Sequence, residues 1–149
     1  VTDDEISTAI LTLIEQQKLI TEGAGAVSVA AVLFDKIPVE GKNVVCLLSG
    51  GNIDVTILSR VISRGLLKAG RSADITIELA DKPGQLSGVS KIVADLGGNV
   101  VAVYHDRADL DMDINACFLR LVLETRYHAH VEEIKRALTA AGYKLAARA

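Results

Sequence analysis

Aromatic residues and cysteines are scarce in this chain. Its 149 residues include no tryptophan, two phenylalanines, three tyrosines and two cysteines. Because half of the residues are hydrophobic, we expect a core of aliphatic side chains, as in packed α/β layers. Cys46 and Cys117 each lie within an apolar run. This placement favours buried free thiols in a reducing, cytoplasmic environment over a disulfide framework.

The chain also lacks the patterns of nucleic-acid-binding and membrane proteins. Its formal net charge is −3, which provides no basic surface for nucleic acid. We find no run of about 18 apolar residues, so we expect no membrane span, and we recognise no signal peptide. The first residue is Val1 and the single methionine is Met112. We therefore expect a fragment or a processed chain.

The first 70 residues carry helix and strand patterns typical of an α/β domain. A capping-box spacing at Thr2 and Glu5 and an apolar stripe predict a helix over 3–18. An Ala-rich segment predicts a second, nearly all-buried helix over 23–34. The apolar run 43–48 is typical of a strand buried on both faces of a parallel sheet. A helical stripe begins at Val55, so the local order around 49–52 is strand, glycine loop, helix.

A polar, glycine-containing segment, 68–72, is the predicted domain boundary. Beyond it, stretches in which apolar residues recur every second residue alternate with stretches in which they recur at the helical period of 3.6 residues. They predict strand 75–79, helix 86–96, strand 99–104, strand 116–123, helix 131–141 and strand 143–145. This βαββαβ order is that of a ferredoxin-like sandwich.

Two glycine-rich segments of the first part have the chemistry of a ligand site. Ser49-Gly50-Gly51-Asn52 places open backbone at the end of the predicted strand, where α/β folds bind ligands. A Ser hydroxyl there can hydrogen-bond a heteroaromatic nitrogen, and the glycines allow a flat ring to approach. The alternative is a plain tight turn followed by an Asn52 helix cap. Glu22, which opens Glu22-Gly-Ala-Gly-Ala26, would by itself be a helix-start carboxylate.

Together, in this order, the two segments resemble cofactor-wall segments of the threonine dehydratase (threonine ammonia-lyase) family. The resemblance implies that pyridoxal phosphate is the cofactor, with Ser49 facing its pyridine nitrogen and Glu22 lining its cleft. No lysine here lies in the family's Schiff-base setting, and no run of four glycines is present to hold the phosphate. We therefore expect this chain alone to be inactive and to hold no cofactor covalently. The cofactor-binding residues implied are Glu22, Ser49, Gly50, Gly51 and Asn52.

The segment Asp81-Lys-Pro-Gly-Gln-Leu86 lies between the first strand and first helix of the sandwich. Pro83 and Gly84 form a turn that leaves free amides at a helix N-terminus, where a carboxylate can bind. This segment resembles the ligand loop of an ACT domain, and Gly97-Gly98-Asn99-Val100 matches that family's second ligand-contact region. The alternative is an empty loop on a bare ferredoxin-like fold. The effector-binding residues implied are Asp81, Pro83, Gly84, Gln85, Leu86, Asn99 and Val100.

Two apparent metal motifs are rejected, so no metal site is expected. The run from Asp109 to Asp113 imitates the start of a calcium loop, but Ile114 occupies the required glycine position and Arg120 the bidentate glutamate position. His128-x-His130 lacks partners at metal-ligand spacing, and both histidines are expected to be exposed at the start of a helix.

These observations predict an α/β protein with two parts. Residues 1–70 are the C-terminal part of a fold-type-II pyridoxal-phosphate domain, and 72–149 are one ferredoxin-like ACT domain. The resemblance implies a parent that converts L-threonine, or L-serine, to a 2-oxo acid and ammonia. It also implies a homo-oligomer regulated by an amino acid, with isoleucine or valine favoured.

The residues are also compatible with two alternative hypotheses about function. One is a stand-alone amino-acid-sensing or assembly module without catalysis, which would have no need of the Ser49–Asn52 segment. The other is a serine racemase or threonine synthase relative, which the attached ACT-like unit disfavours.

Overall fold

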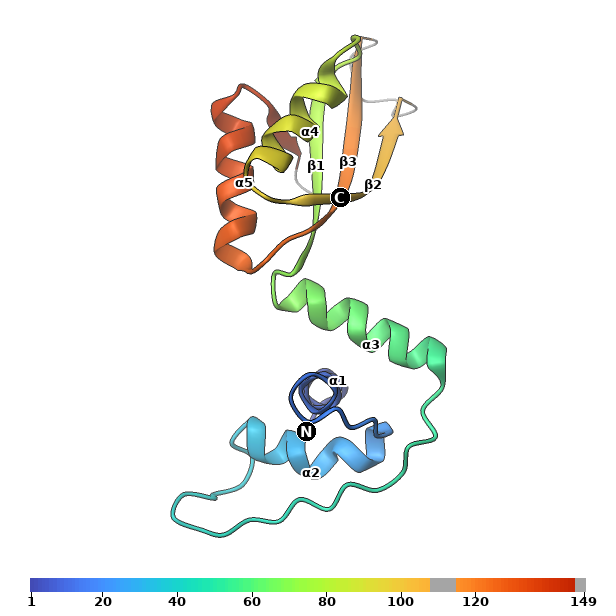
Figure 1. The fold of residues 1–149 in the computed structure, drawn as a ribbon, viewed down its shortest axis with the longest axis vertical. Coiled ribbons are helices and arrows are strands. Elements are labelled where there is room, and N and C mark those ends of the chain that lie inside the picture. The colour runs from blue at the N-terminus through green and yellow to red at the C-terminus, as the bar shows by residue number, and fades with distance from the viewer. Residues whose placement is uncertain (108–114, 147–149) are drawn as a thin grey trace. The chain divides into compact units, whose positions relative to one another are not determined.

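The computed structural model describes residues 1–107 and 115–146. By its internal contacts the chain divides into two compact units, 1–65 and 66–149 (Figure 1). The division lies a few residues before the expected boundary segment 68–72. None of the described helices is both long enough and apolar enough to cross a lipid bilayer.

The first helix of the N-terminal unit begins at a capping box, as its sequence predicts. Helix α1 (Asp3–Thr12) starts after Thr2, whose hydroxyl accepts from the Glu5 amide at 3.3 Å while the Glu5 carboxylate accepts from the Thr2 amide at 2.8 Å. It continues as a π-helical turn, η1 (Leu13–Gln17), and ends at Lys18, whose φ is +58°. The predicted helix over 3–18 is confirmed.

Two further helices complete the core of this unit. They are α2 (Gly23–Leu33) and α3 (Val55–Lys68). Helix α2 packs on α1 through its small residues, but Val27 and Leu33 on it are 39% and 46% exposed. The expected near-complete burial of α2 is therefore wrong for this chain. The buried residues of the unit's core are Ala9, Ile10, Leu13, Ala26, Ala30 and Val61.

The apolar run 43–48 is not a buried strand in this structure. Val45 is 94% exposed and Leu47 is 79% exposed. Across the described ranges, the one sheet lies in the second unit, so no strand pairs with this segment. A strand in a parallel sheet needs neighbouring strands for its backbone hydrogen bonds and covered faces for the burial of its side chains. Without these neighbours, the apolar side chains of 43–48 are not buried.

The second unit is a four-stranded antiparallel sheet with two helices. Its strand order is β2-β3-β1-β4. The predicted βαββαβ order is confirmed. The elements are β1 (Ser72–Ala80), α4 (Gln85–Asp95), β2 (Asn99–Asp106), β3 (Ala116–Glu124), α5 (His128–Ala140) and β4 (Lys144–Ala146).

Both helices cover the same face of this sheet (Figure 1). Burial alternates along β1 and β3, because successive side chains point to opposite faces. The other face carries Arg120, which pairs with Asp74 and lies over the Tyr104 ring at 5.3 Å. The buried core consists of Ala73, Ile75, Ile77, Leu79, Val89, Val93, Cys117, Leu119, Leu121, Leu123, Val131, Ile134 and Leu138.

His130 is a buried structural residue, so its expected exposure is wrong. Its side chain is fully buried. Nδ1 accepts from the Arg126 amide at 3.1 Å, and Nε2 therefore carries the proton and donates to the Leu96 carbonyl at 3.0 Å. His128 is exposed, as expected. The rejected calcium motif, Asp109–Asp113, lies outside the described residues.

Candidate cofactor and effector sites

The structure brings the two glycine-rich segments of the first unit together. The buried Thr21 hydroxyl lies 3.2 Å from the Ser49 carbonyl oxygen and 3.0 Å from that of Gly50, to which it donates. The Glu22 amide donates to the Gly50 carbonyl at 3.4 Å. The start of α2 and the Ser49–Gly50 turn therefore form one surface. Sequence reasoning missed Thr21, whose only signal is a polar residue next to Glu22.

Glycine is required at two positions where these segments meet. A Cβ on Gly25 would lie 1.8 Å from the Ser49 carbonyl oxygen and 2.1 Å from the Thr21 hydroxyl. Gly50 has a φ of +73°, and a Cβ there would lie 2.5 Å from the Glu22 carboxyl group. Any side chain at either position would separate the two segments or displace the carboxylate.

Asn52 does not cap the helix that follows, so that part of the plain-turn alternative is wrong. Asp54 takes this role: its carboxylate accepts from the Thr56 amide at 2.7 Å and the Ile57 amide at 3.2 Å. The Thr56 side chain, followed by these two amides, holds the pKa of Asp54 below its usual range. Ser49, Gly50, Gly51 and Asn52 are all exposed, so their polar groups can reach a ligand.

The expected effector loop borders a cleft in the second unit. The cleft has a volume of about 430 Å³. Gly84, with a φ of +91°, is the N-cap of α4, so the loop ends where that helix exposes its first amides. The residues lining the cleft are Leu79, Asp81, Lys82, Pro83, Gly84, Gln85, Leu86, His105, Arg107 and Leu119.

Asn99 and Val100 lie at the other end of the sheet from this loop. Asn99 is opposite Glu124, which is opposite Ser72 at the start of β1, whereas Asp81 follows the end of β1. Val100 packs against the unit's own core. Within one chain, the expected effector-binding residues are therefore divided between the two ends of the sheet, with Asn99 and Val100 at one end and the loop at the other.

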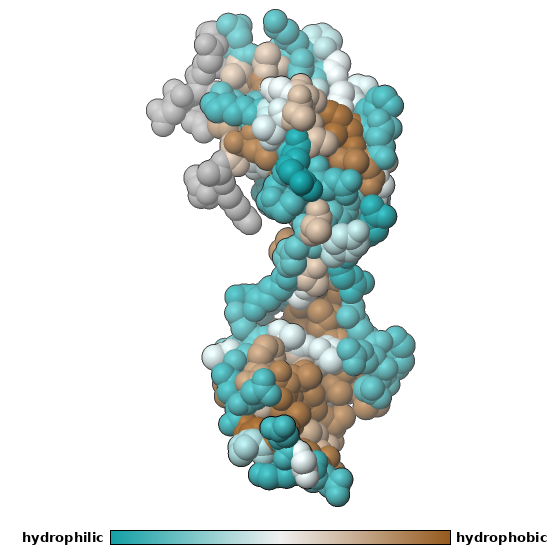
Figure 2. Space-filling view, turned by 90° about the vertical axis from the view of Figure 1, so that its left-hand side faces the viewer, coloured by the Kyte–Doolittle hydropathy of each residue, from teal (hydrophilic) through white to brown (hydrophobic). Residues whose placement is uncertain are grey.

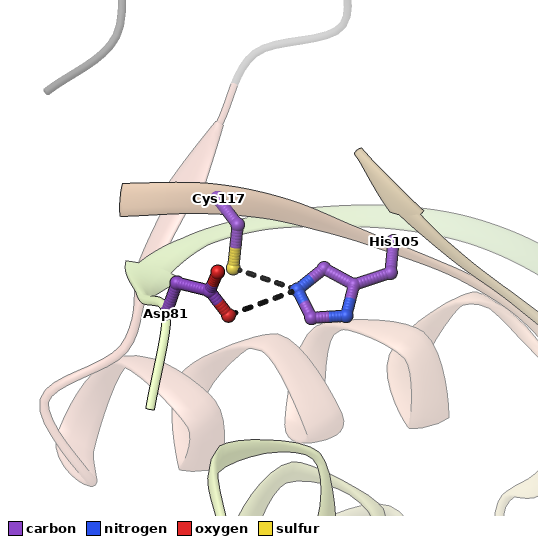
Figure 3. A group of neighbouring side chains, drawn as sticks. All are labelled: Asp81, His105 and Cys117. Carbon is purple, nitrogen blue, oxygen red and sulfur yellow. Dashed lines mark hydrogen bonds and ion pairs between the residues drawn. The ribbon is translucent and has the colours of Figure 1, made fainter. Parts of the chain in front are cut away.

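A further group of side chains at the cleft was not predicted (Figure 3). His105 Nε2 lies 2.9 Å from Cys117 Sγ and 3.8 Å from an Asp81 carboxylate oxygen. Arg107 pairs with the same carboxylate, with Nε–Oδ2 and Nη2–Oδ1 distances of 2.9 and 3.0 Å. Burial raises the pKa of the Cys117 thiol, and the negative charge of Asp81 raises it further.

We predict that Gly25→Ala destabilises the first unit, by about 1–3 kcal/mol, because its new methyl group overlaps the Ser49 carbonyl. Gly23→Ala is the matched control, since a Cβ there would meet only an Ile6 methyl at 3.7 Å. Urea denaturation of both variants measures the difference. Equal stability of the two variants would show that the packing of Gly25 against Ser49 is not maintained in solution.

The chain has relatives among known proteins along nearly its whole length. No model of a protein family matches it. It is 48% identical over 145 residues to an L-threonine ammonia-lyase of Thermotoga maritima, covering 97% of this chain and 36% of that protein. It is 40% identical to an L-threonine ammonia-lyase of Geobacter sulfurreducens, covering 96% of this chain and 36% of that protein.

A shorter stretch of the chain matches a further relative. A catabolic L-threonine dehydratase of Staphylococcus aureus is 49% identical over 78 residues, which cover 50% of this chain and 22% of that protein. The chain thus spans about a third of the length of the two relatives that match it throughout. Over nearly all of its own length, the chain is therefore similar to one part of these two L-threonine ammonia-lyases.

Proposed function

We propose that this chain is the C-terminal part of a pyridoxal-phosphate-dependent L-threonine ammonia-lyase. Its first unit would form one wall of the cofactor site, and its second unit would bind a regulatory amino acid. The whole protein would release ammonia from L-threonine and give 2-oxobutyrate. The observation that carries this proposal is the contact of Thr21 with Ser49 and of Glu22 with Gly50, on a chain that is 48% identical to one of these lyases over 145 residues.

The residues present fit one wall of a pyridoxal-phosphate site. The exposed Ser49 hydroxyl can donate to a pyridine nitrogen and leave it unprotonated. Space remains beside the backbone at Gly51, where a Cβ would meet only the Ile20 carbonyl oxygen at 3.6 Å, so a flat ring can approach. When bound, the cofactor would withdraw electrons from the substrate's Cα. The lysine that holds it would come from the part of the protein outside this chain.

The exposed apolar run 43–48 supports the same proposal. Two of its side chains, Val45 and Leu47, are 94% and 79% exposed, and Figure 2 shows apolar side chains gathered over the first unit. In the whole lyase, we infer, this segment joins a parallel sheet whose other strands lie outside the chain. The Ser49–Asn52 turn then lies at the carboxyl end of a strand, where α/β folds bind ligands.

In the full-length lyase, Ser49→Ala should weaken cofactor binding and slow turnover. The substitution leaves a buried ring nitrogen without its partner, at a cost of about 1–3 kcal/mol. Cofactor affinity and 2-oxobutyrate formation measure the effect. Ser63→Ala, at an exposed position on α3, is the control. Unchanged affinity and turnover in Ser49→Ala would remove Ser49 from the cofactor site.

For the second unit, we propose an ACT domain whose effector site is shared between two copies. Its β2 is an edge strand, and Val101 and Tyr104 on it are 56% and 55% exposed. An exposed edge of this kind can pair with another strand. Antiparallel pairing of β2 with the same strand of a second copy, about a two-fold axis, sets the start of one strand beside the end of the other.

This pairing would bring Asn99 of the second copy close to the proposed effector loop of the first copy. His105, near the end of β2, and Arg107, just beyond it, line the cleft beside Asp81–Leu86. The start of the second copy's β2, with its Asn99, would therefore approach the same cleft. The amides after Pro83 would hold the effector's carboxylate, and Leu86, which is 43% exposed, would contact an aliphatic side chain such as that of isoleucine or valine.

The chain should therefore be a dimer at micromolar concentration that isoleucine or valine stabilises. A ligand at about 100 times its dissociation constant adds about 2.7 kcal/mol of stability, which thermal denaturation with millimolar amino acid detects. Gly84→Asp places a negative charge where the carboxylate would bind, so it should abolish the shift. Gly142→Asp is the control, because Gly142 also has a positive φ and open surroundings. Sedimentation velocity reports the dimer.

Two results would count against this part of the proposal. A folded monomer would contradict both the pairing and the shared site. A folded dimer whose melting temperature no branched-chain amino acid changes would leave the second unit as an assembly module only.

A further inference from the structure

Three potential metal ligands converge where β1, β2 and β3 meet the effector cleft (Figure 3). Asp81 directly follows β1, His105 lies in β2, and Cys117 lies in β3. One ligand atom from each, Nε2, Sγ and a carboxylate oxygen, lies within 4.8 Å of the other two. The three residues are far apart in sequence, so their convergence arises from the pairing of the strands.

Strand pairing fixes the backbone around this group. Cys117 is opposite Leu79 of β1, two residues before Asp81, and His105 is opposite Leu119 of β3, two residues after Cys117. Residues two apart on a strand point to the same face, so His105 and Cys117 share the face that the helices cover. The Cys117 side chain is fully buried, whereas the Asp81 and His105 side chains are about one-third exposed, which leaves a path from solvent.

The ligand set suits zinc. Zn²⁺ binds thiolate sulfur at about 2.3 Å and imidazole nitrogen at about 2.0 Å in tetrahedral geometry, so its sulfur and nitrogen ligands lie about 3.5 Å apart. The Sγ–Nε2 distance of 2.9 Å is shorter than this spacing, and the Nε2–Oδ1 distance of 3.8 Å is longer than a nitrogen and an oxygen ligand require, so each pair must shift by a few tenths of an ångström. Small side-chain rotations would therefore open a tetrahedral position between the three atoms.

Arg107 is the main competitor for such an ion, because its guanidinium pairs with Asp81. Its side chain is 65% exposed, so it can leave the carboxylate for solvent at little cost, as expected for an exposed ion pair. A zinc ion would then replace the guanidinium as the cation beside Asp81. The thiolate and the carboxylate together balance its charge.

We propose that Asp81, His105 and Cys117 form a zinc-binding site at the mouth of this cleft. On binding, the Cys117 thiol loses its proton to solvent and its sulfur joins the metal. His105 binds through Nε2 and keeps its proton on Nδ1, and one Asp81 oxygen is the third protein ligand. Water completes the tetrahedron. The site cross-links β1, β2 and β3, and it does not depend on the lyase or effector proposals.

Titration of the metal-free 149-residue chain with Zn²⁺ and with Co²⁺ tests this site. We expect one equivalent per chain at micromolar concentration and, with Co²⁺, the near-ultraviolet absorption of a thiolate–cobalt bond. Cys117→Ser should abolish that absorption, and His105→Gln should weaken binding by about tenfold or more, at least as much as the loss of an outer-shell partner. The controls Cys46→Ser and His128→Gln change the other free cysteine and an exposed histidine, and both should bind as the unaltered chain does.

Arg107→Gln distinguishes a metal site from a purely structural cluster. Removing the competing guanidinium should tighten zinc binding several-fold, and because Arg107 is exposed this variant remains informative if Cys117→Ser fails to fold. The proposal is overturned if the unaltered chain binds no stoichiometric zinc at micromolar concentration. It is also overturned if Arg107→Gln and His105→Gln leave the affinity unchanged, or if the cobalt absorption depends on Cys46 rather than on Cys117.

Discussion

The antiparallel pairing of β1 with β3 is the interaction on which the second unit depends. It runs without a break from Ser72 opposite Glu124 to Ala80 opposite Ala116. In this register, the inward-facing residues of both strands form one continuous apolar face of the sheet, because side chains alternate between the two faces. Helices α4 and α5 pack on that apolar face through five buried aliphatic residues of their own. The register ends with Ala80 opposite Ala116, and the next residue, Asp81, has its carboxylate within 4.8 Å of the Cys117 thiol, so the strand pairing positions these cleft residues.

The first unit is organised by close backbone contact rather than by a sheet. Its core of six buried residues is small, and its most specific feature is the contact of Thr21 and Gly25 with the Ser49–Gly50 turn. Val45 and Leu47, which precede that turn, are exposed. A unit that packs the Ser49–Gly50 turn closely while exposing an apolar run is consistent with our proposal that it is part of a larger domain. The relatives, of which the chain covers 36%, fit this interpretation.

Features set by local pattern were predictable from the sequence. The capping box at Thr2, the helical stripes and the βαββαβ order depend on spacing alone, and each is confirmed. Features that depend on residues brought close by the tertiary structure were not predictable from the sequence. The run 43–48 would need partner strands that the described residues do not supply. Asn99 lies far from the expected effector loop because strand register, which the sequence does not reveal, puts it at the start of β2 and the loop near the end of that strand. His130 was misjudged because its two backbone partners, at Arg126 and Leu96, are a tertiary feature. The Asp81, His105 and Cys117 group was missed for the same reason.

Amide hydrogen exchange of residues 44–48 tests the central claim, that the first unit is one part of a larger lyase domain. These amides have no strand partner among the described residues, so they should exchange without protection in the 149-residue chain. In the full-length protein, they should become strongly protected, because the segment would pair within a parallel sheet. Protection of β1 and β3 should be the same in both proteins and serves as the internal reference. Fast exchange of residues 44–48 in the full-length protein would contradict the account.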